Sequence, residues 1–152
     1  MLLWYVLACA TKDEPGDTGA CDTENEECGP DVDGCGGEGS NMLPGSDCVT
    51  CHSPGEEGEG SFSIAGTVYV DIDGSDGLED AVIRVTDANG DVFELDSHSS
   101  GSFYTEDDTV PPLQAEIEVD GEVVSMAADV ETGACNSCHS CEGAAGGKLF
   151  GP

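Results

Sequence analysis

The hydrophobic residues of the chain are concentrated between residues 62 and 127, in short runs separated by turn-forming residues. The runs are rich in β-branched and aromatic residues, and several alternate apolar with polar positions, as strands with one buried face do. They predict six strands, at 62–70, 80–86, 92–96, 102–105, 114–119 and 122–127. Asn89-Gly90 and Asp120-Gly121 favour tight hairpins between neighbouring strands. We therefore expect an all-β protein, folded as a small antiparallel β-sandwich with Ile83 and Phe103 in its core.

The segment before the predicted strands has a different composition. Residues 11–47 are dominated by Asp, Glu, Gly, Pro and Thr and contain almost nothing to bury. Such sequences stay disordered and are extended by their own charge. We divide the chain into a signal remnant at 1–9, a disordered acidic linker at 10–47 and a β-sandwich domain at 48–152.

The charge balance restricts the kinds of partner and activity. The chain has 3 Lys and Arg residues against 33 Asp and Glu residues, a net charge of −30. Nucleic acid and anionic membrane surfaces are excluded as partners, because binding their phosphates requires Lys and Arg. The sequence also contains no Ser-His-Asp arrangement and no phosphate-binding Gly loop with a Lys. We expect the protein not to be an enzyme.

A Cys/His motif stands at each end of the β-rich segment. Residues 48–52 and 135–139 both read C-x-x-C-H, and two of the three histidines of the chain occupy the last position of this motif. The spacing is the one used to attach a c-type haem: two thiols form thioethers with the porphyrin, and the following His ligates the iron. The motifs therefore predict two covalently bound haem c groups, held by Cys48, Cys51, His52, Cys135, Cys138 and His139.

Three further residues are candidates for a sixth iron ligand. They are His98, Met126 and Met42, because imidazole and thioether groups both serve as axial ligands of haem. For His98 the alternative is an exposed loop position, and for Met126 it is an ordinary place in the core.

The same cysteines allow two other interpretations, because C-x-x-C pairs also bind metal ions and form disulfides. Cys48, Cys51, Cys135 and Cys138 could together hold one zinc or iron ion, or all cysteines could form disulfides. Nine cysteines in the chain suit an oxidising compartment. Those outside the motifs and Cys9 are an even number, enough for two disulfides: Cys21, Cys28, Cys35 and Cys141.

The N-terminus resembles a lipoprotein signal. Val6-Leu7-Ala8-Cys9 is similar to a bacterial lipobox, in which the Cys is diacylated after cleavage. The apolar residues 1–8 are too few to span a bilayer, and no positive region precedes them, so we expect the natural start to lie upstream. The resemblance, with Ala10 after the Cys, implies a lipid anchor on Cys9 at the outer membrane of a bacterial cell envelope. Membrane contact would then be through the lipid alone.

The order of strands resembles the carboxypeptidase-regulatory-like domain, a transthyretin-like sandwich. The stretch 64–68, Ile-Ala-Gly-Thr-Val, is similar to the opening strand of this family, and 99–104, Ser-Ser-Gly-Ser-Phe-Tyr, to its turn and following strand. The stretch 77–85 resembles its second strand, with Asp80 where Gly is usual. The resemblance implies a scaffold and brings no catalytic residues.

Together these features predict a secreted, membrane-tethered c-type cytochrome that exchanges electrons with a redox protein partner. The layout is similar to that of small secreted multihaem c-type proteins. The alternative is a non-catalytic cell-surface binding or structural module, stapled by a four-cysteine metal site or by disulfides.

Overall fold

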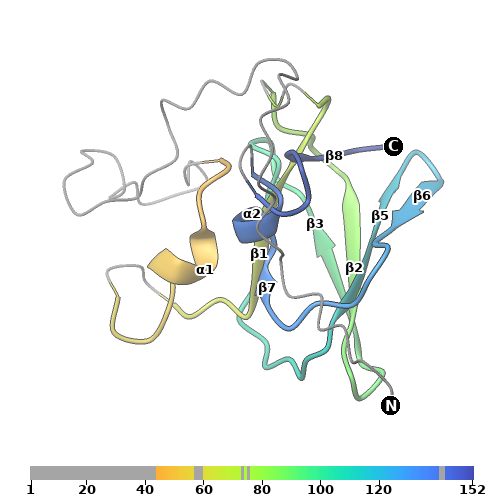
Figure 1. The fold of residues 1–152 in the computed structure, drawn as a ribbon. Helices are drawn as coiled ribbons and strands as arrows, with labels where there is room; N and C mark the ends of the chain where they lie inside the picture. The colour runs from red at the N-terminus through yellow and green to blue at the C-terminus, as the bar shows by residue number, and fades with distance from the viewer. Residues whose placement is uncertain (1–43, 57–59, 73, 75, 141–142) are drawn as a thin grey trace, which may run out of the picture.

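The computed structural model describes residues 44–56, 60–72, 74, 76–140 and 143–152. Two one-turn helices and eight strands lie within this part of the chain (Figure 1). In chain order they are α1 (Cys48–Cys51), β1 (Ile64–Tyr69), β2 (Val82–Thr86), β3 (Val92–Asp96), β4 (Ser102–Thr105), β5 (Gln114–Val119), β6 (Glu122–Ser125), β7 (Gly133–Ala134), α2 (Cys135–Cys138) and β8 (Leu149–Phe150). The expected signal remnant, and the expected linker as far as residue 43, lie outside the described residues.

The strands form two sheets. In the first, β1 pairs antiparallel with β4 on one edge and parallel with β7 and β8. The second sheet is antiparallel throughout, in the order β3-β2-β5-β6. The predicted all-β class and the two-sheet sandwich are confirmed. The parallel pairs of β7 and β8 were not predicted, because a strand of two residues carries no readable alternation.

Both predicted hairpins are present. β2 pairs with β3 across Asn89-Gly90, and β5 pairs with β6 across Asp120-Gly121. Asp120 and Gly121 have φ angles of 52° and 84°, the left-handed conformation that a type I′ turn requires at both central residues. The turn residues therefore fix the register of these strand pairs.

The hydrophobic core lies between the two sheets. Burial alternates along β2, so that Ile83 and Val85 point inward while their neighbours on the strand are partly exposed. Ile83 is 2 % exposed and Phe103 is 1 % exposed, which confirms both as core residues. The cluster is made of Ile64, Val68, Ala81, Ile83, Val85, Phe103, Leu113 and Ile117.

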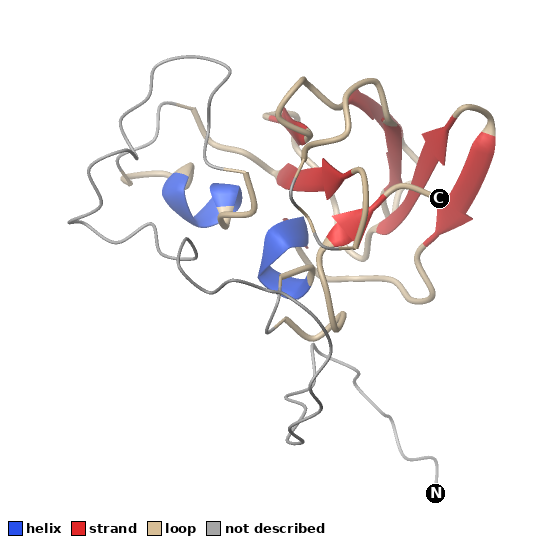
Figure 2. Cartoon of the chain, turned by 90° about the horizontal axis from the view of Figure 1, so that it is seen from above, coloured by secondary structure: helices blue, strands red, loops and turns tan. Residues whose placement is uncertain are grey.

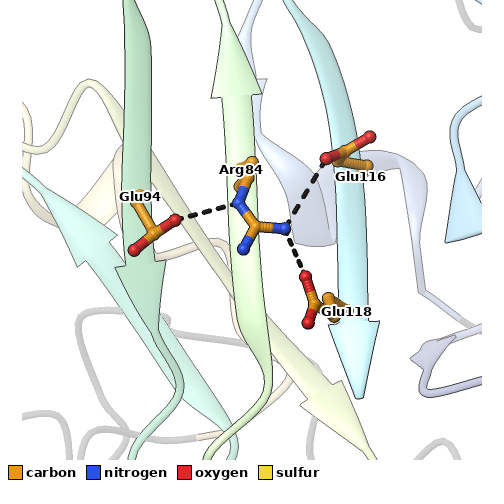
Figure 3. A network of polar contacts seen from close by, with 4 residues as sticks. All are labelled: Arg84, Glu94, Glu116 and Glu118. Atoms are coloured by element: carbon orange, nitrogen blue, oxygen red, sulfur yellow. Dashed lines mark hydrogen bonds and ion pairs between the residues drawn. The ribbon is translucent and has the colours of Figure 1, made fainter. Parts of the chain in front are cut away.

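The outer face of the second sheet carries an ion-pair group around Arg84 on β2 (Figure 3). Arg84 Nε donates to Glu94 on β3 at 2.9 Å, and its Nη1 donates to Glu118 on β5 at 2.6 Å, with Glu116 at 3.7 Å. The hydrogen bond to Glu118, then that to Glu94, raises the pKa of the guanidinium. Exposed ion pairs contribute little to the free energy of unfolding. The main effect of Arg84 is therefore to offset the negative charge of the carboxylates on β3 and β5, the two strands that flank β2.

β1 is buried along its whole length on both faces. Ile64 and Val68 face the core between the sheets, whereas Ala65, Thr67 and Tyr69 occupy the alternate positions. A strand of a two-layer sandwich usually has one wet face. Here α1 and α2 both lie against β1, and Ala65 packs with Cys48 and Val49 of α1.

Replacing Phe103 with Ala tests the packing between the sheets. We expect a loss of about 3–5 kcal/mol in the free energy of unfolding, because a fully buried ring leaves a cavity. The measurement is urea denaturation. The control is Val92→Ala on β3, a side chain 61 % exposed, which should change stability by no more than about 0.5 kcal/mol. Equal, small losses in the two variants would contradict the described core.

Candidate functional site

The two C-x-x-C-H motifs fold into the same local structure. Each Cys-to-Cys segment forms one helical turn, α1 or α2, and the following His closes it. The N–H of His52 donates to the Cys48 carbonyl at 2.8 Å, and the N–H of His139 donates to the Cys135 carbonyl at 2.8 Å. Since residues three apart on a helical turn lie on one face, each motif presents its two sulfurs on the same side.

The first cysteine of each motif makes the same hydrogen bond. Cys48 Sγ donates to the Ser46 carbonyl at 3.3 Å, and Cys135 Sγ donates to the Gly133 carbonyl at 3.4 Å. In both cases the acceptor lies two residues earlier in the chain. The repeated sequence spacing thus produces a repeated structural unit that includes the residues leading into the turn.

Both turns lie against β1 on the same side of the molecule, away from the β5–β6 hairpin (Figures 1 and 2). Cα atoms of α1 come within 8 Å of those of β1 and of β7, the strand that leads directly into α2. The motifs therefore share one region of the fold, although the β-rich segment separates them in sequence.

Cys135 is held in a site that disfavours its charged form. Burial, with smaller contributions from the neighbouring Cys48 and Asp47, raises the pKa of the Cys135 thiol to about 12. Cys135 is consequently a neutral thiol at physiological pH. The influence of Cys48 on this pKa is electrostatic evidence that the first cysteines of the two motifs are neighbours.

Gly66 on β1 permits the close approach of the second motif. A Cβ at this position would lie 2.6 Å from Phe103 Cζ and 2.8 Å from Cys135 Cβ. Both distances are shorter than van der Waals contact allows. A side chain at residue 66 would therefore push α2 away from β1 or displace a core ring.

Asn136, the first variable residue of the second motif, joins both motifs to β1. Its side chain is nearly inaccessible, with the residue 3 % exposed. Its Oδ1 accepts from the Thr67 N–H at 3.0 Å, and its Nδ2 donates to the Ser46 carbonyl at 2.8 Å and to Thr67 Oγ1 at 3.2 Å. Thr67 Oγ1 also accepts from the N–H of Gly45 at 3.0 Å.

These bonds attach residues 44–47, which the sequence assigned to the linker, to the sandwich. Ser46 is 6 % exposed, so this segment packs on the domain and leads directly into α1. The hydroxyl of Ser46 is buried and has no hydrogen-bond partner among the described residues. A buried hydroxyl of this kind beside a motif is the feature expected where a water or a bound group completes the site.

The two motif histidines are oriented by different contacts. Burial lowers the pKa of His139, while a hydrogen bond to the backbone of Gly147 opposes that shift. His139 is therefore neutral at physiological pH, with one ring nitrogen donating to a carbonyl. The ring of His52 instead stacks on Phe62, with 4.0 Å between centroids and 16° between planes.

The stacking continues beyond Phe62 as a row of rings. Phe62 stacks on Tyr104 with centroids 4.4 Å apart, and His98 lies 6.1 Å from Tyr104 in a tilted arrangement. The row runs from the partly buried His52 to the exposed His98. The structure thus relates His98 to the first motif through two intervening rings.

Met126, a candidate iron ligand, lies beside the second sheet. Met126 directly follows β6, and its backbone bonds to Ala115 and to the side chain of Gln114, both in the second sheet. Both motifs adjoin the first sheet. Several predicted positions lie outside the described residues: Met42, Cys9, Cys21, Cys28, Cys35 and Cys141.

Cys138 is disulfide-bonded. A sulfur in a disulfide cannot form a thioether or ligate a metal ion until the disulfide is reduced. In the part of the chain that the structure describes, no group of three or more His, Cys, Asp or Glu residues is arranged to hold a metal ion. The four motif cysteines therefore do not form a preassembled zinc or iron site there.

Comparison with protein-family models, curated proteins and solved structures found no match. The resemblance of Ile64–Tyr104 to the carboxypeptidase-regulatory-like domain accordingly stays a prediction. None of the described helices is long and apolar enough to cross a membrane.

Sequence reasoning missed the residues that connect the motifs. Asn136 and Thr67 act through tertiary contacts between distant segments, and neither carries a motif of its own. Phe62 was assigned to a strand and not to the site. The one available signal for Asn136 was an amide placed inside the second motif, where the first motif has Val49.

Replacing Gly66 with Ala tests the approach of α2 to β1. We expect a loss of about 1–3 kcal/mol in stability, because the added methyl group overpacks a close contact. Gly147→Ala is the matched control, since a Cβ there meets nothing within 4 Å and the carbonyl that binds His139 is kept. Chemical denaturation of both variants provides the comparison. A Gly66→Ala variant as stable as the control would show that α2 is not held this closely.

The state of Cys135 predicts a slow alkylation. In chain produced without haem, at about pH 8, we expect Cys135 to react about 1,000-fold more slowly with iodoacetamide in the folded state than in urea. The reason is the raised pKa of about 12 against an ordinary 9.0, which leaves fewer reactive thiolates. Peptide mapping by mass spectrometry measures both rates on the same residue. Equal rates in the two states would refute the burial of this thiol.

The same pKa implies a pH dependence of stability. Below pH 9 the thiol is neutral in both states, and between about 9 and about 12 it ionises in the unfolded chain while staying neutral in the folded one. Its contribution to stability is therefore lost as the pH rises through this window. In Cys135→Ala, the fall in the free energy of unfolding over that window should be smaller.

Proposed function

We propose that the protein is a one-electron carrier with haem c attached at both C-x-x-C-H motifs. The observation that supports this most directly is the repetition of structure. Each motif forms the same turn, with its two cysteines on one face and its His at the same place. Disulfides would account for cysteine pairs, but not for a His in the same position of both turns.

The donor set fits haem at the first motif and fits at the second after one change. A metal-ligating His usually donates its other ring N–H to a carbonyl, as His139 does to Gly147, and it ligates in the neutral state. At the first motif, Phe62 orients the His52 ring, and the unpartnered Ser46 hydroxyl lies two residues from Cys48. At the second motif, a dithiol reductant would first have to reduce the Cys138 disulfide to two thiols and would itself be oxidised to a disulfide.

The chain's own residues perform binding and orientation. The thiols of Cys48, Cys51, Cys135 and Cys138 would hold the haems through thioether bonds, and His52 and His139 would ligate the iron. Bound haem supplies reversible one-electron chemistry at its iron. Burial of Cys48 and of Phe62 excludes water from one side of the first motif.

The charge of the chain indicates the kind of redox partner. A net charge of −30 attracts basic proteins over distances comparable to the Debye length and repels acidic ones. We therefore propose a redox protein with a basic docking surface. A lipid on Cys9 would keep the carrier at the outer membrane, where such a partner must also act.

The second candidate is a non-catalytic module in which the cysteines are structural. The Cys138 disulfide is the specific observation that favours it. In that case disulfides staple the segments leading into α1 and α2, and a zinc or iron ion held by Cys48, Cys51, Cys135 and Cys138 would require the Cys138 disulfide to be reduced first. No electron would then be carried.

Production in a bacterial periplasm with the haem-ligation machinery separates these functions. We expect a red protein whose mass exceeds that of the chain by two haems and stays so after denaturation, because thioethers do not dissociate. Cys48→Ser combined with Cys51→Ser should remove one haem and keep the other. His139→Ala should keep both haems and change the absorption spectrum of one.

A colourless protein of unmodified mass would rule out the carrier. One zinc per chain, lost when either motif is changed, would establish the four-cysteine site instead. Intact mass, metal analysis and absorption spectra of the same sample provide all these outcomes.

A further inference from the structure

We infer that the outer edge of β6 is a docking site for an extended basic segment of a partner protein, which adds to the second sheet as an antiparallel strand. The inference goes beyond electron transfer and does not depend on haem, because it rests on the backbone and side chains of β5 and β6 alone. Figure 2 shows the outer strands of the second sheet on the side of the molecule opposite the two helical turns.

The backbone of β6 presents unpaired groups along this edge. Among the described residues β6 is the last strand of its sheet, in the order β3-β2-β5-β6. The N–H of Met126 donates to a carbonyl of β5, and backbone groups alternate in direction along a strand, so those of Val124 also face β5. The N–H and C=O groups of Val123 and Ser125 therefore point away from the sheet. An added strand would form its ladder hydrogen bonds with these four groups.

The described part of the chain neither covers nor blunts this edge. All four residues of β6 are exposed, and β6 contains no Pro, no Lys and no bulge, the features by which natural sheets protect an edge. Val124 lies opposite Ile117, on the core-facing side of the sheet, yet Val124 is 55 % exposed and Ile117 is 7 % exposed. The first sheet therefore does not cover β6, whereas β3, at the other edge, lies against β4. An apolar side chain placed beside Val124 would bury both.

The outer face of the sheet is acidic where it meets this edge. One row across the four strands consists of Glu94, Arg84, Glu116 and Ser125. Arg84 donates hydrogen bonds to Glu94 and Glu118, but it stands 3.7 Å from Glu116, too far for a hydrogen bond (Figure 3). The Glu116 side chain is also 39 % exposed. Its carboxylate is therefore the member of this row that can accept a hydrogen bond from a further cation.

The register of the strands specifies the chemistry of the partner. A residue opposite Ser125 on an added strand would continue the row, two strand spacings or about 10 Å from Glu116. The long side chain of Lys or Arg can extend over the small Ser125 to this carboxylate. The next residue of the added strand would lie beside Val124 on the other face. The partner segment is therefore expected to alternate basic and apolar residues.

A second copy of this chain does not fit the edge. Two chains with a net charge of −30 repel each other, and β6 has no basic residue to place beside Glu116. The charge complementarity of the edge therefore favours a basic partner over self-association.

The docking is tested by adding a short synthetic peptide of alternating Lys and Val, blocked at both ends, to the full-length chain. Amide hydrogen exchange, followed by NMR spectroscopy, locates the bound peptide, because acidic residues elsewhere in the chain also attract cations. We expect the amides of Val123 and Ser125 to exchange at least about tenfold more slowly with the peptide than without it. The same peptide with Glu in place of Lys should leave both amides unchanged.

Variants of the edge separate docking from general attraction. Ser125→Pro removes an outward N–H without removing a hydrogen bond to β5, so the sheet should fold and the peptide should no longer protect the Val123 amide. Glu116→Gln should raise the peptide concentration that gives half-maximal protection by about two- to fivefold. Asp96→Asn is the matched control, since it removes one charge from β3 at the other edge of the same sheet and should change this concentration less.

Three results would overturn the inference. The first is a Val123 amide and a Ser125 amide that exchange as in the free chain at the highest peptide concentration. The second is equal weakening in Glu116→Gln and Asp96→Asn, which decides the question if Ser125→Pro does not fold. The third is a dimer, detected by analytical ultracentrifugation without peptide, in which these amides are already protected; the edge would then bind a second copy of the chain.

Discussion

The whole structure depends on the burial of β1. Both of its faces are covered, so its side chains and its backbone groups must all find partners in the protein. β4 satisfies one edge, and β7, Asn136 and β8 in turn satisfy the groups on the other. This burial also determines the position of the second motif, because the segments that complete this edge of β1 carry or follow that motif. The same contacts therefore complete the edge of the strand and place the motif.

The sequence predicted those parts of the fold in which the local residue pattern and the tertiary packing favour the same structure. β3, β4 and β5 have the expected bounds, because alternation and turn residues such as Asn89-Gly90 delimit them. β7 and β8 could not be predicted, since Gly133 and Ala134 have low strand propensity and pair only because β1 offers an open edge. The helical turns were missed for the same reason: four residues are too few to stabilise a helix without tertiary support.

The sequence predicted which residues belong to the candidate site, but not how they are arranged in space. The motif spacing identified His52 and His139 because chemistry imposes that spacing. The proximity of Cys48 to Cys135 depends on where β7 pairs, and the stacking of Phe62 on His52 depends on where the chain re-enters β1. Neither contact can be predicted from the local sequence. The disulfide of Cys138 is a further case, since pairing of cysteines cannot be deduced from their positions in the chain.

The extreme charge of the chain explains why its buried polar links are neutral. With 3 basic residues against 33 acidic ones, few cations are available to pair with a buried carboxylate. One of them, Arg84, already pairs with glutamates on the outer face of the second sheet. Asp87, a buried carboxylate, is instead satisfied by the backbone N–H groups of Asn89, Asp91 and Val110. An amide at residue 136 follows the same logic, because it can donate to a carbonyl without bringing a charge. In so acidic a protein, long-range connections have to be made by amides, hydroxyls and backbone groups, and the junction between the two motifs is built from these alone.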